Sequence, residues 1–70
     1  MKYTVRYNNW EAGKGYNYTD VIDTFDSSDC LVCPLNEIAK EYANYCVNDG
    51  DEVKVYDEND NLVSEYEHNI

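Results

Sequence analysis

The feature that most limits the possible folds is an apolar stripe within residues 34–47. Counted from Leu35, apolar residues recur 3, 4, 7, 8, 11 and 12 positions later, which is the spacing of one face of an α-helix. The stripe consists of Leu35, Ile38, Ala39, Tyr42, Ala43, Cys46 and Val47. Pro34 suits the first turn of a helix, and Gly50 is typical of residues that follow a helix end. The sequence therefore predicts one amphipathic helix, whose apolar face needs a second layer to cover it.

The N-terminal part of the chain predicts a β-hairpin. Residues Lys2–Asn8 alternate strictly, so that two tyrosines and Val5 share one face of a half-buried strand. Residues 16–25 fit two interpretations, a strand or a short helix capped by Thr19. Their β-branched and aromatic residues favour the strand, which we expect to pair with the first strand. The glycine-containing segment between them reads as a loop, with Trp10 near its tip or folded over a sheet edge.

The C-terminal part predicts a second hairpin and completes the fold. Residues 52–56 and 62–67 flank the sequence DENDN, whose residues tolerate turn geometry. The order of elements is then ββαββ in a single domain, residues 1–70. This predicts an α+β protein in which one helix packs on a four-stranded, mostly antiparallel sheet. A β-grasp-like topology, with the first and last strands central and parallel, is one order compatible with this class.

The distribution of charge is the strongest indication of function. The chain has 15 acidic residues and 5 basic ones, for a net charge of −10. Direct binding to nucleic acid or to an anionic membrane needs Lys and Arg facing phosphates, so neither partner is expected. The natural partners of so acidic a chain are basic protein surfaces. We expect the carboxylates to form the contact surface for such a partner.

Two groups of acidic residues are the candidates for this surface. Eight lie in the last 22 residues, where Lys54 is the one base, and a second group recurs every three positions from Asp20. The predicted partner-binding residues are Asp20, Asp23, Asp26, Asp29, Asp49, Asp51, Glu52, Asp57, Glu58, Asp60, Glu65 and Glu67. Alternate residues on one strand face lie about 6.6 Å apart, which is comparable to the spacing of phosphates along a DNA strand.

The whole chain resembles a known class of proteins in size, charge and aromatic content. The acidic segment DGDEVKVYDEND and the regular spacing of acidic residues from Asp20 to Asp29 are the features that carry this resemblance. The proteins of this class are the small, acidic, tyrosine-rich proteins of phages and mobile elements that block host defences, including DNA-mimicking anti-restriction and anti-CRISPR proteins. The resemblance implies an inhibitor in the cytoplasm of a bacterial host. Its target would be a nucleic-acid-binding protein, whose basic surface the inhibitor occupies.

Two alternative interpretations remain open. Cys30 and Cys33 form a CxxC motif at the predicted helix start, and with Cys46 and His68 they could make a small zinc or thiol module. Against this, Cys46 lies about 18 Å along a helix from Pro34 at 1.5 Å per residue, so bound metal is not expected. In the other alternative, the chain is a structural orphan domain whose acidity only keeps it soluble.

The sequence gives no indication of an enzyme. It contains one histidine and no glycine-rich phosphate loop or nucleophile motif, so neither catalysis nor a cofactor is expected. The first ten residues alternate and lack the apolar core of a signal peptide. No segment approaches the roughly 20 apolar residues of a membrane span. These features predict a soluble, cytoplasmic protein.

Overall fold

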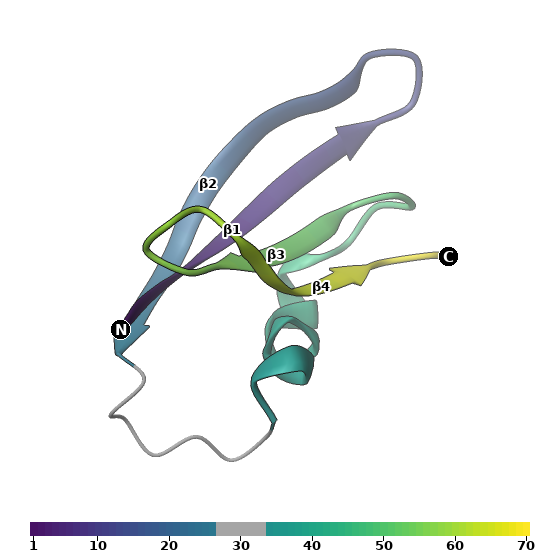
Figure 1. The fold of residues 1–70 in the computed structure, drawn as a ribbon. Coiled ribbons are helices and arrows are strands. Elements are labelled where there is room, and N and C mark those ends of the chain that lie inside the picture. Colours follow the sequence, from purple (N-terminus) through teal and green to yellow (C-terminus); the bar gives the residue numbers. More distant parts are fainter. Residues whose placement is uncertain (27–33) are drawn as a thin grey trace.

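The fold of the chain is the predicted ββαββ arrangement (Figure 1). The computed structural model describes residues 1–26 and 34–70, and the side chain of Tyr18 is not among the described parts. The elements are β1 (Lys2–Glu11), β2 (Gly15–Asp26), a helix η1 (Leu35–Tyr45), β3 (Glu52–Tyr56) and β4 (Leu62–Glu67). Residues 16–25 thus belong to a strand, as favoured, and the C-terminal hairpin has the predicted bounds.

The four strands form one sheet in the order β2-β1-β3-β4, and every neighbouring pair is antiparallel. The predicted α+β class is confirmed, but the β-grasp-like order is wrong. That order would place β1 beside β4 in parallel, whereas β1 pairs with β3 and β4 lies at the edge. The burial of the strands explains this order. Val5, Val53 and Val55 are wholly buried and belong in the centre, whereas the exposed Glu65 and Glu67 are best hydrated at an edge.

The helix has the predicted position but a tighter geometry, because η1 is a 3₁₀-helix rather than an α-helix. Near its ends the backbone hydrogen bonds span three residues: Glu37 donates to Pro34 and Cys46 donates to Ala43. In the middle, the buried Ser64 hydroxyl of β4 accepts from the Ala39 amide at 3.0 Å and donates to a helix carbonyl at 3.1 Å. The Ser64 hydroxyl thus bridges the Ala39 amide and the Asn36 carbonyl, which are the two groups that a 3₁₀ turn pairs.

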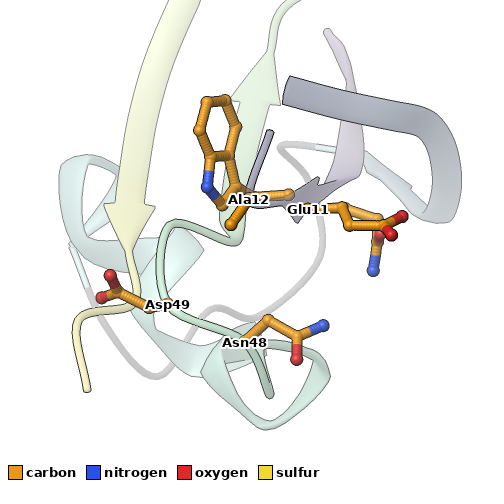
Figure 2. Close-up of a pocket in the computed structure, with 6 residues that line it drawn as sticks. Glu11, Ala12, Asn48 and Asp49 are labelled. Atoms are coloured by element: carbon orange, nitrogen blue, oxygen red, sulfur yellow. The ribbon is translucent and has the colours of Figure 1, made fainter. Parts of the chain in front are cut away.

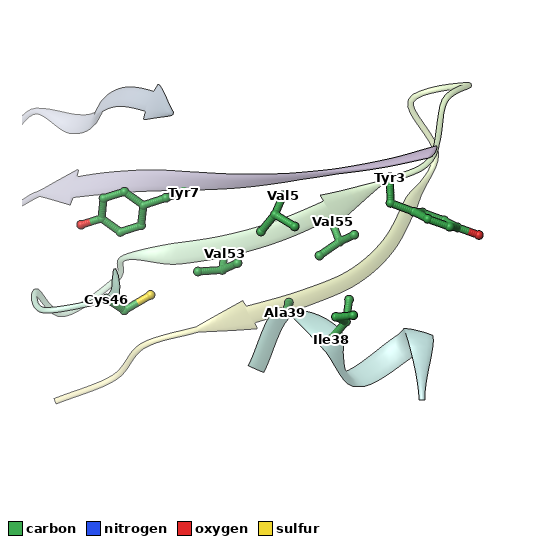
Figure 3. Close-up of a cluster of buried hydrophobic side chains, with 8 residues drawn as sticks. All are labelled: Tyr3, Val5, Tyr7, Ile38, Ala39, Cys46, Val53 and Val55. Atoms are coloured by element: carbon green, nitrogen blue, oxygen red, sulfur yellow. The ribbon is translucent and has the colours of Figure 1, made fainter. Parts of the chain in front are cut away.

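The core lies between η1 and one face of the sheet (Figure 3). Its buried members are Tyr3, Val5, Tyr7, Ile38, Ala39, Cys46, Val53 and Val55. Phe25 of β2 extends the core by stacking on Tyr3 with ring centroids 5.1 Å apart. Fully burying a Val or Ile side chain contributes roughly 1.5–3 kcal/mol, so this small set supplies most of the stability of the domain. Within residues 1–26 and 34–70 no helix covers the opposite face of the sheet, where charged side chains can be hydrated.

Candidate functional site

Asp51 was expected on the acidic surface, but it is wholly buried and serves the fold. Its carboxylate accepts four hydrogen bonds, from the Tyr7 hydroxyl at 2.8 Å and from three backbone amides. The amides belong to Trp10, Val47 and Asn48, at 2.8, 3.1 and 3.0 Å respectively. These donors come from β1 and from the segment between η1 and β3. Asp51 therefore connects β1 to the segment that follows η1. Because it is buried, its carboxylate cannot contact a partner protein.

The pKa of the Asp51 carboxyl follows from the same contacts. Desolvation by burial raises this pKa, but the four hydrogen bonds favour the charged form. Together they outweigh the burial and hold the pKa below its ordinary value. Asp51 is thus ionised in the folded protein, and its negative charge stabilises the fold by accepting these four hydrogen bonds.

Three further predicted residues of the hairpin have internal partners. Asp57 begins the β3–β4 turn and accepts from the Asn59 and Asn61 amides, both at 2.9 Å. The Asn61 amide is the largest cause of its lowered pKa. Asp60 has a left-handed backbone, with φ of 63°, and its carboxylate lies 3.6 Å from the Arg6 guanidinium. Glu52 lies 3.7 Å from the Lys54 ammonium.

The second predicted group, on β2, does not form a single row. The register places Asp20 opposite Tyr7 and Asp23 opposite Val5, so both lie on the helix side of the sheet. A β-bulge between these pairs brings the two carboxylates to one face. Asp26 lies opposite Lys2 on the other face and pairs with the N-terminal ammonium at 3.7 Å. Asp29 lies outside the described residues.

Four of the predicted residues remain as a common exposed surface on the edge of the sheet. Each is exposed, and none forms an ion pair with a Lys or Arg within residues 1–26 and 34–70. We call them the β4-edge carboxylates: Asp49, Glu58, Glu65 and Glu67. They follow the outer strand from the loop before β3 to the β3–β4 turn. This surface is the part of the predicted acidic site that can meet a partner.

Two hollows adjoin this edge at its Asp49 end, and sequence reasoning did not find them. The larger, of about 440 Å³, is lined by Asn9, Trp10, Glu11, Ala12, Asn48 and Asp49 (Figure 2). The smaller, of about 200 Å³, is lined by Trp10, Tyr16, Asp49, Gly50, Glu67 and Asn69. Trp10 and Asp49 belong to both. The hollows thus lie side by side and share an aromatic ring and a carboxylate.

Trp10 is held in place by a glycine from a distant part of the chain. Gly50 has φ of 91°, which favours glycine, and a Cβ atom added there would lie 2.7 Å from Trp10 Cδ1. The indole ring of Trp10 therefore packs directly against the backbone of Gly50, where a side chain would collide with it. A conspicuous signal was available in the sequence, because Trp10 is the only tryptophan and Gly50 one of three glycines. The sequence does not say, however, that these two residues meet.

Tyr16 stands against Trp10, with ring centroids 4.8 Å apart and ring planes at 69°. The Glu52 carboxylate accepts a hydrogen bond from the Tyr16 phenol and is the main reason that the pKa of Tyr16 is raised to about 12. Desolvation and the negative charges of Glu52, Glu67 and Asp51 raise it further. The electrostatic potential around the Trp10 and Tyr16 rings is therefore negative, because the carboxylates of Glu52, Glu67 and Asp51 act on this region.

Cys46 bears on the zinc or thiol interpretation. Its thiol is buried in the core, and burial, followed by the charges of Asp51 and Glu52, raises its pKa. This environment favours the thiol over the thiolate that metal binding or nucleophilic chemistry requires. Cys30 and Cys33 lie outside the described residues. Within the described ranges no group of three or more metal-binding side chains comes together.

The fold and the site define a small α+β protein that combines an acidic sheet edge with an aromatic hollow. Comparisons with protein-family models, with curated proteins and with solved structures found no match for this chain. In the parts of the chain that the structure describes, no helix is long and apolar enough to cross a membrane.

Proposed function

We propose that the protein is a non-enzymatic interaction protein that binds a basic surface of another protein. The observation that carries the proposal is the set of β4-edge carboxylates, which are exposed and lack a basic partner within residues 1–26 and 34–70. The other predicted acidic residues of the hairpin are engaged within the fold, whereas these four are exposed to the Lys and Arg side chains of a partner. Of the four, Asp49 also accepts a hydrogen bond from the Ile70 amide at 3.1 Å through Oδ1. A complementary basic surface gains both attraction and faster, steered association.

The position of one of these carboxylates, Glu67, costs the fold some stability, which supports a role in binding. Glu67 lies directly opposite Glu52 in the β3–β4 pair, and like charges in this arrangement repel one another. At the centre of the open face, by contrast, Arg6 and Lys54 lie opposite each other and each has an acidic neighbour at 3.6–3.7 Å. On β4 itself, Glu65 lies opposite Lys54, whereas Glu67 has only the like charge of Glu52 across from it.

The partner that best fits this edge is a protein that normally holds phosphates. Glu65 and Glu67 project from the same face of β4 at a spacing of about 6.6 Å, and Glu58 continues the negative charge into the turn. Lys and Arg side chains arranged to grip a nucleic-acid backbone would meet these carboxylates in a similar way. In this role the protein acts as a DNA mimic, which is the function that its resemblance to anti-defence inhibitors implies.

The proposal is tested by affinity capture from a bacterial lysate, using the protein as bait. We expect nucleic-acid-binding proteins to be captured, to be released as salt rises towards 0.5 M, and to be displaced by duplex DNA. The bait variant Glu58→Gln/Glu65→Gln/Glu67→Gln should lose this capture. The matched control is Asp20→Asn/Glu37→Gln/Glu41→Gln, which changes the net charge equally at exposed positions on β2 and η1.

Two results would contradict the proposal. If both triple variants capture the same proteins equally well, the acidic edge is not the contact surface. If duplex DNA fails to displace the captured protein while salt does, the partner is basic but the mimicry of nucleic acid is wrong. Circular dichroism of both variants establishes that each retains the sheet.

A further inference from the structure

The smaller hollow beside Trp10 has the features of a site for a single side chain. Trp10 and Tyr16 meet at 69° and form an aromatic corner, with Gly50 leaving room at its base. Asp49 and Glu67 complete the lining on the acidic side. With a volume of about 200 Å³ the hollow is under half the size of its neighbour. We call this site, bounded by Trp10, Tyr16, Asp49 and Glu67, the aromatic corner.

The charges distinguish the aromatic corner from the larger hollow. In the larger hollow, Glu11 lies 3.6 Å from the Lys14 ammonium, and its carboxylate also accepts a hydrogen bond from Asn17. In the aromatic corner, neither Asp49 nor Glu67 has a basic partner within the described ranges. Tyr16 is neutral, and its hydroxyl donates to Glu52. The corner therefore combines ring surfaces with uncompensated negative charge.

We propose that the aromatic corner binds the guanidinium group of an arginine side chain from the partner protein. The inference deepens the proposed function and rests on it, since it names the group that anchors the partner's basic surface. A guanidinium group is planar, so it stacks on the ring of Trp10 or Tyr16 while its N–H groups reach Asp49 and Glu67. It is also more weakly hydrated than an ammonium group, which makes its transfer from water into the corner less costly.

Other ligands fit the corner less well. A neutral sugar or amide gains the aromatic contact but leaves both carboxylates without a countercharge. A lysine ammonium group gains the charge contact, but it is a compact, strongly hydrated cation without a planar surface to stack. A nucleic acid is repelled, because its phosphates would face Asp49 and Glu67. Arginine alone satisfies the rings and the carboxylates together.

The binding can be followed directly, because Trp10 is the only tryptophan of the chain. We would titrate the intact protein with N-acetyl-arginine amide, N-acetyl-lysine amide and N-acetyl-citrulline amide, and record Trp10 fluorescence and its indole N–H signal by NMR. Citrulline is the matched neutral probe, since it has the shape of arginine without its charge. We expect saturable binding of the arginine probe at millimolar concentrations, at least threefold weaker binding of the lysine probe, and no saturation with citrulline.

Variants that remove single charges or the Tyr16 ring test which residues bind the arginine probe. Asp49→Asn and Glu67→Gln should each weaken binding of the arginine probe about threefold, which is the range of a single exposed ion pair. Tyr16→Ala should abolish it, whereas Tyr16→Phe, which keeps the ring, should retain it. The control is Glu37→Gln, because it removes the same charge from an exposed position in the first turn of η1, whereas Asp49 follows the other end of that helix. This control should leave the affinity unchanged.

The following results would overturn the inference. Equal binding of citrulline would show that charge plays no part, and equal binding of lysine would exclude a guanidinium-specific site. An equal loss from Glu37→Gln would show a general field of negative charge rather than a site. If the arginine probe fails to bind while the acidic edge still captures a partner in a salt-dependent way, the corner is wrong and the proposed function stands. If both fail, the function itself is wrong.

Discussion

Replacing Asp51 tests whether a buried carboxylate, rather than apolar packing alone, holds the helix end to the sheet. The carboxylate accepts from four donors, which are the Tyr7 hydroxyl and the amides of Trp10, Val47 and Asn48. Asp51→Ala leaves all four without their acceptor. At about 1 kcal/mol for each donor, the free energy of unfolding falls by about 4 kcal/mol. A domain of this size has a total stability of only about 3.5–10 kcal/mol, so this variant should be largely unfolded.

Asp51→Asn is the more informative variant, because it keeps the shape and one acceptor oxygen. Three donors bind one carboxylate oxygen, and the Trp10 amide alone binds the other. The new amide oxygen can take the position with three donors, but its NH₂ group then faces the Trp10 N–H. One donor is lost and the negative charge disappears, so we expect a cost of about 2 kcal/mol.

The assay is urea unfolding followed by circular dichroism and by the fluorescence of Trp10. The matched control is Asp49→Asn, an exposed position two residues away, which should change stability by less than about 0.5 kcal/mol. The pH dependence gives a second test. Because the folded pKa of Asp51 is lowered, its stabilisation is present above the ordinary value of 3.8 and is lost as pH falls through the folded pKa. The reasoning is refuted if Asp51→Asn matches the parent in stability and in its response to acid.

Three further predictions concern the core and the Trp10 region. Ile38→Ala removes a buried helix residue that is 5% exposed and should cost about 2–5 kcal/mol in urea unfolding; an unchanged midpoint would mean that the helix face is misassigned. Gly50→Ala places a methyl group 2.7 Å from Trp10 and should cost more than Gly13→Ala, which has a similar positive φ but open space around it. Equal losses of stability in the two glycine variants would mean that backbone strain alone decides. Glu52→Gln should lower the pKa of Tyr16 from about 12 towards its ordinary 10, measured from the NMR shift of its ring carbon, and an unchanged pKa would exclude the Glu52 hydrogen bond as its cause.

The alternation of apolar residues predicted that the four strands exist and which side of the sheet is buried, but it placed Trp10 in a loop, whereas β1 runs to Glu11 and includes it. Val5, Val53 and Val55 fall on the expected face, and the C-terminal hairpin has the expected bounds. The order of the strands in the sheet could not be predicted from the sequence. It depends on which strand edges meet after the helix has packed, and this is a tertiary property that no single segment encodes. The 3₁₀ form of the helix was also missed, because the spacing of its apolar residues is that of an α-helix face.

The sequence predicted that acidic residues form a surface, but not which of these residues are exposed and which are buried. Asp51 and Asp49 stand on either side of the same glycine and look alike in the sequence, yet one is buried and the other exposed. The difference arises because four donors from distant segments converge on Asp51. The aromatic corner was missed because Tyr16, Gly50 and Glu67 come from three separate parts of the chain.

The pairing of β1 with β3 has a consequence for how the protein is made. Val5 faces Val55, fifty positions later in the chain, whereas β1 and β2 are joined by a short loop. During synthesis at about 5–20 residues per second, the 26 positions from Asp26 to Glu52 take about 1–5 seconds, so the β1–β2 hairpin can form before β3 leaves the ribosome. In that interval β1 presents an open strand edge and an uncovered apolar face, which are features that favour association with other chains. The arrival of the C-terminal hairpin covers this edge of β1 and moves the open edge to β4, where the exposed Glu65 and Glu67 disfavour pairing with another chain.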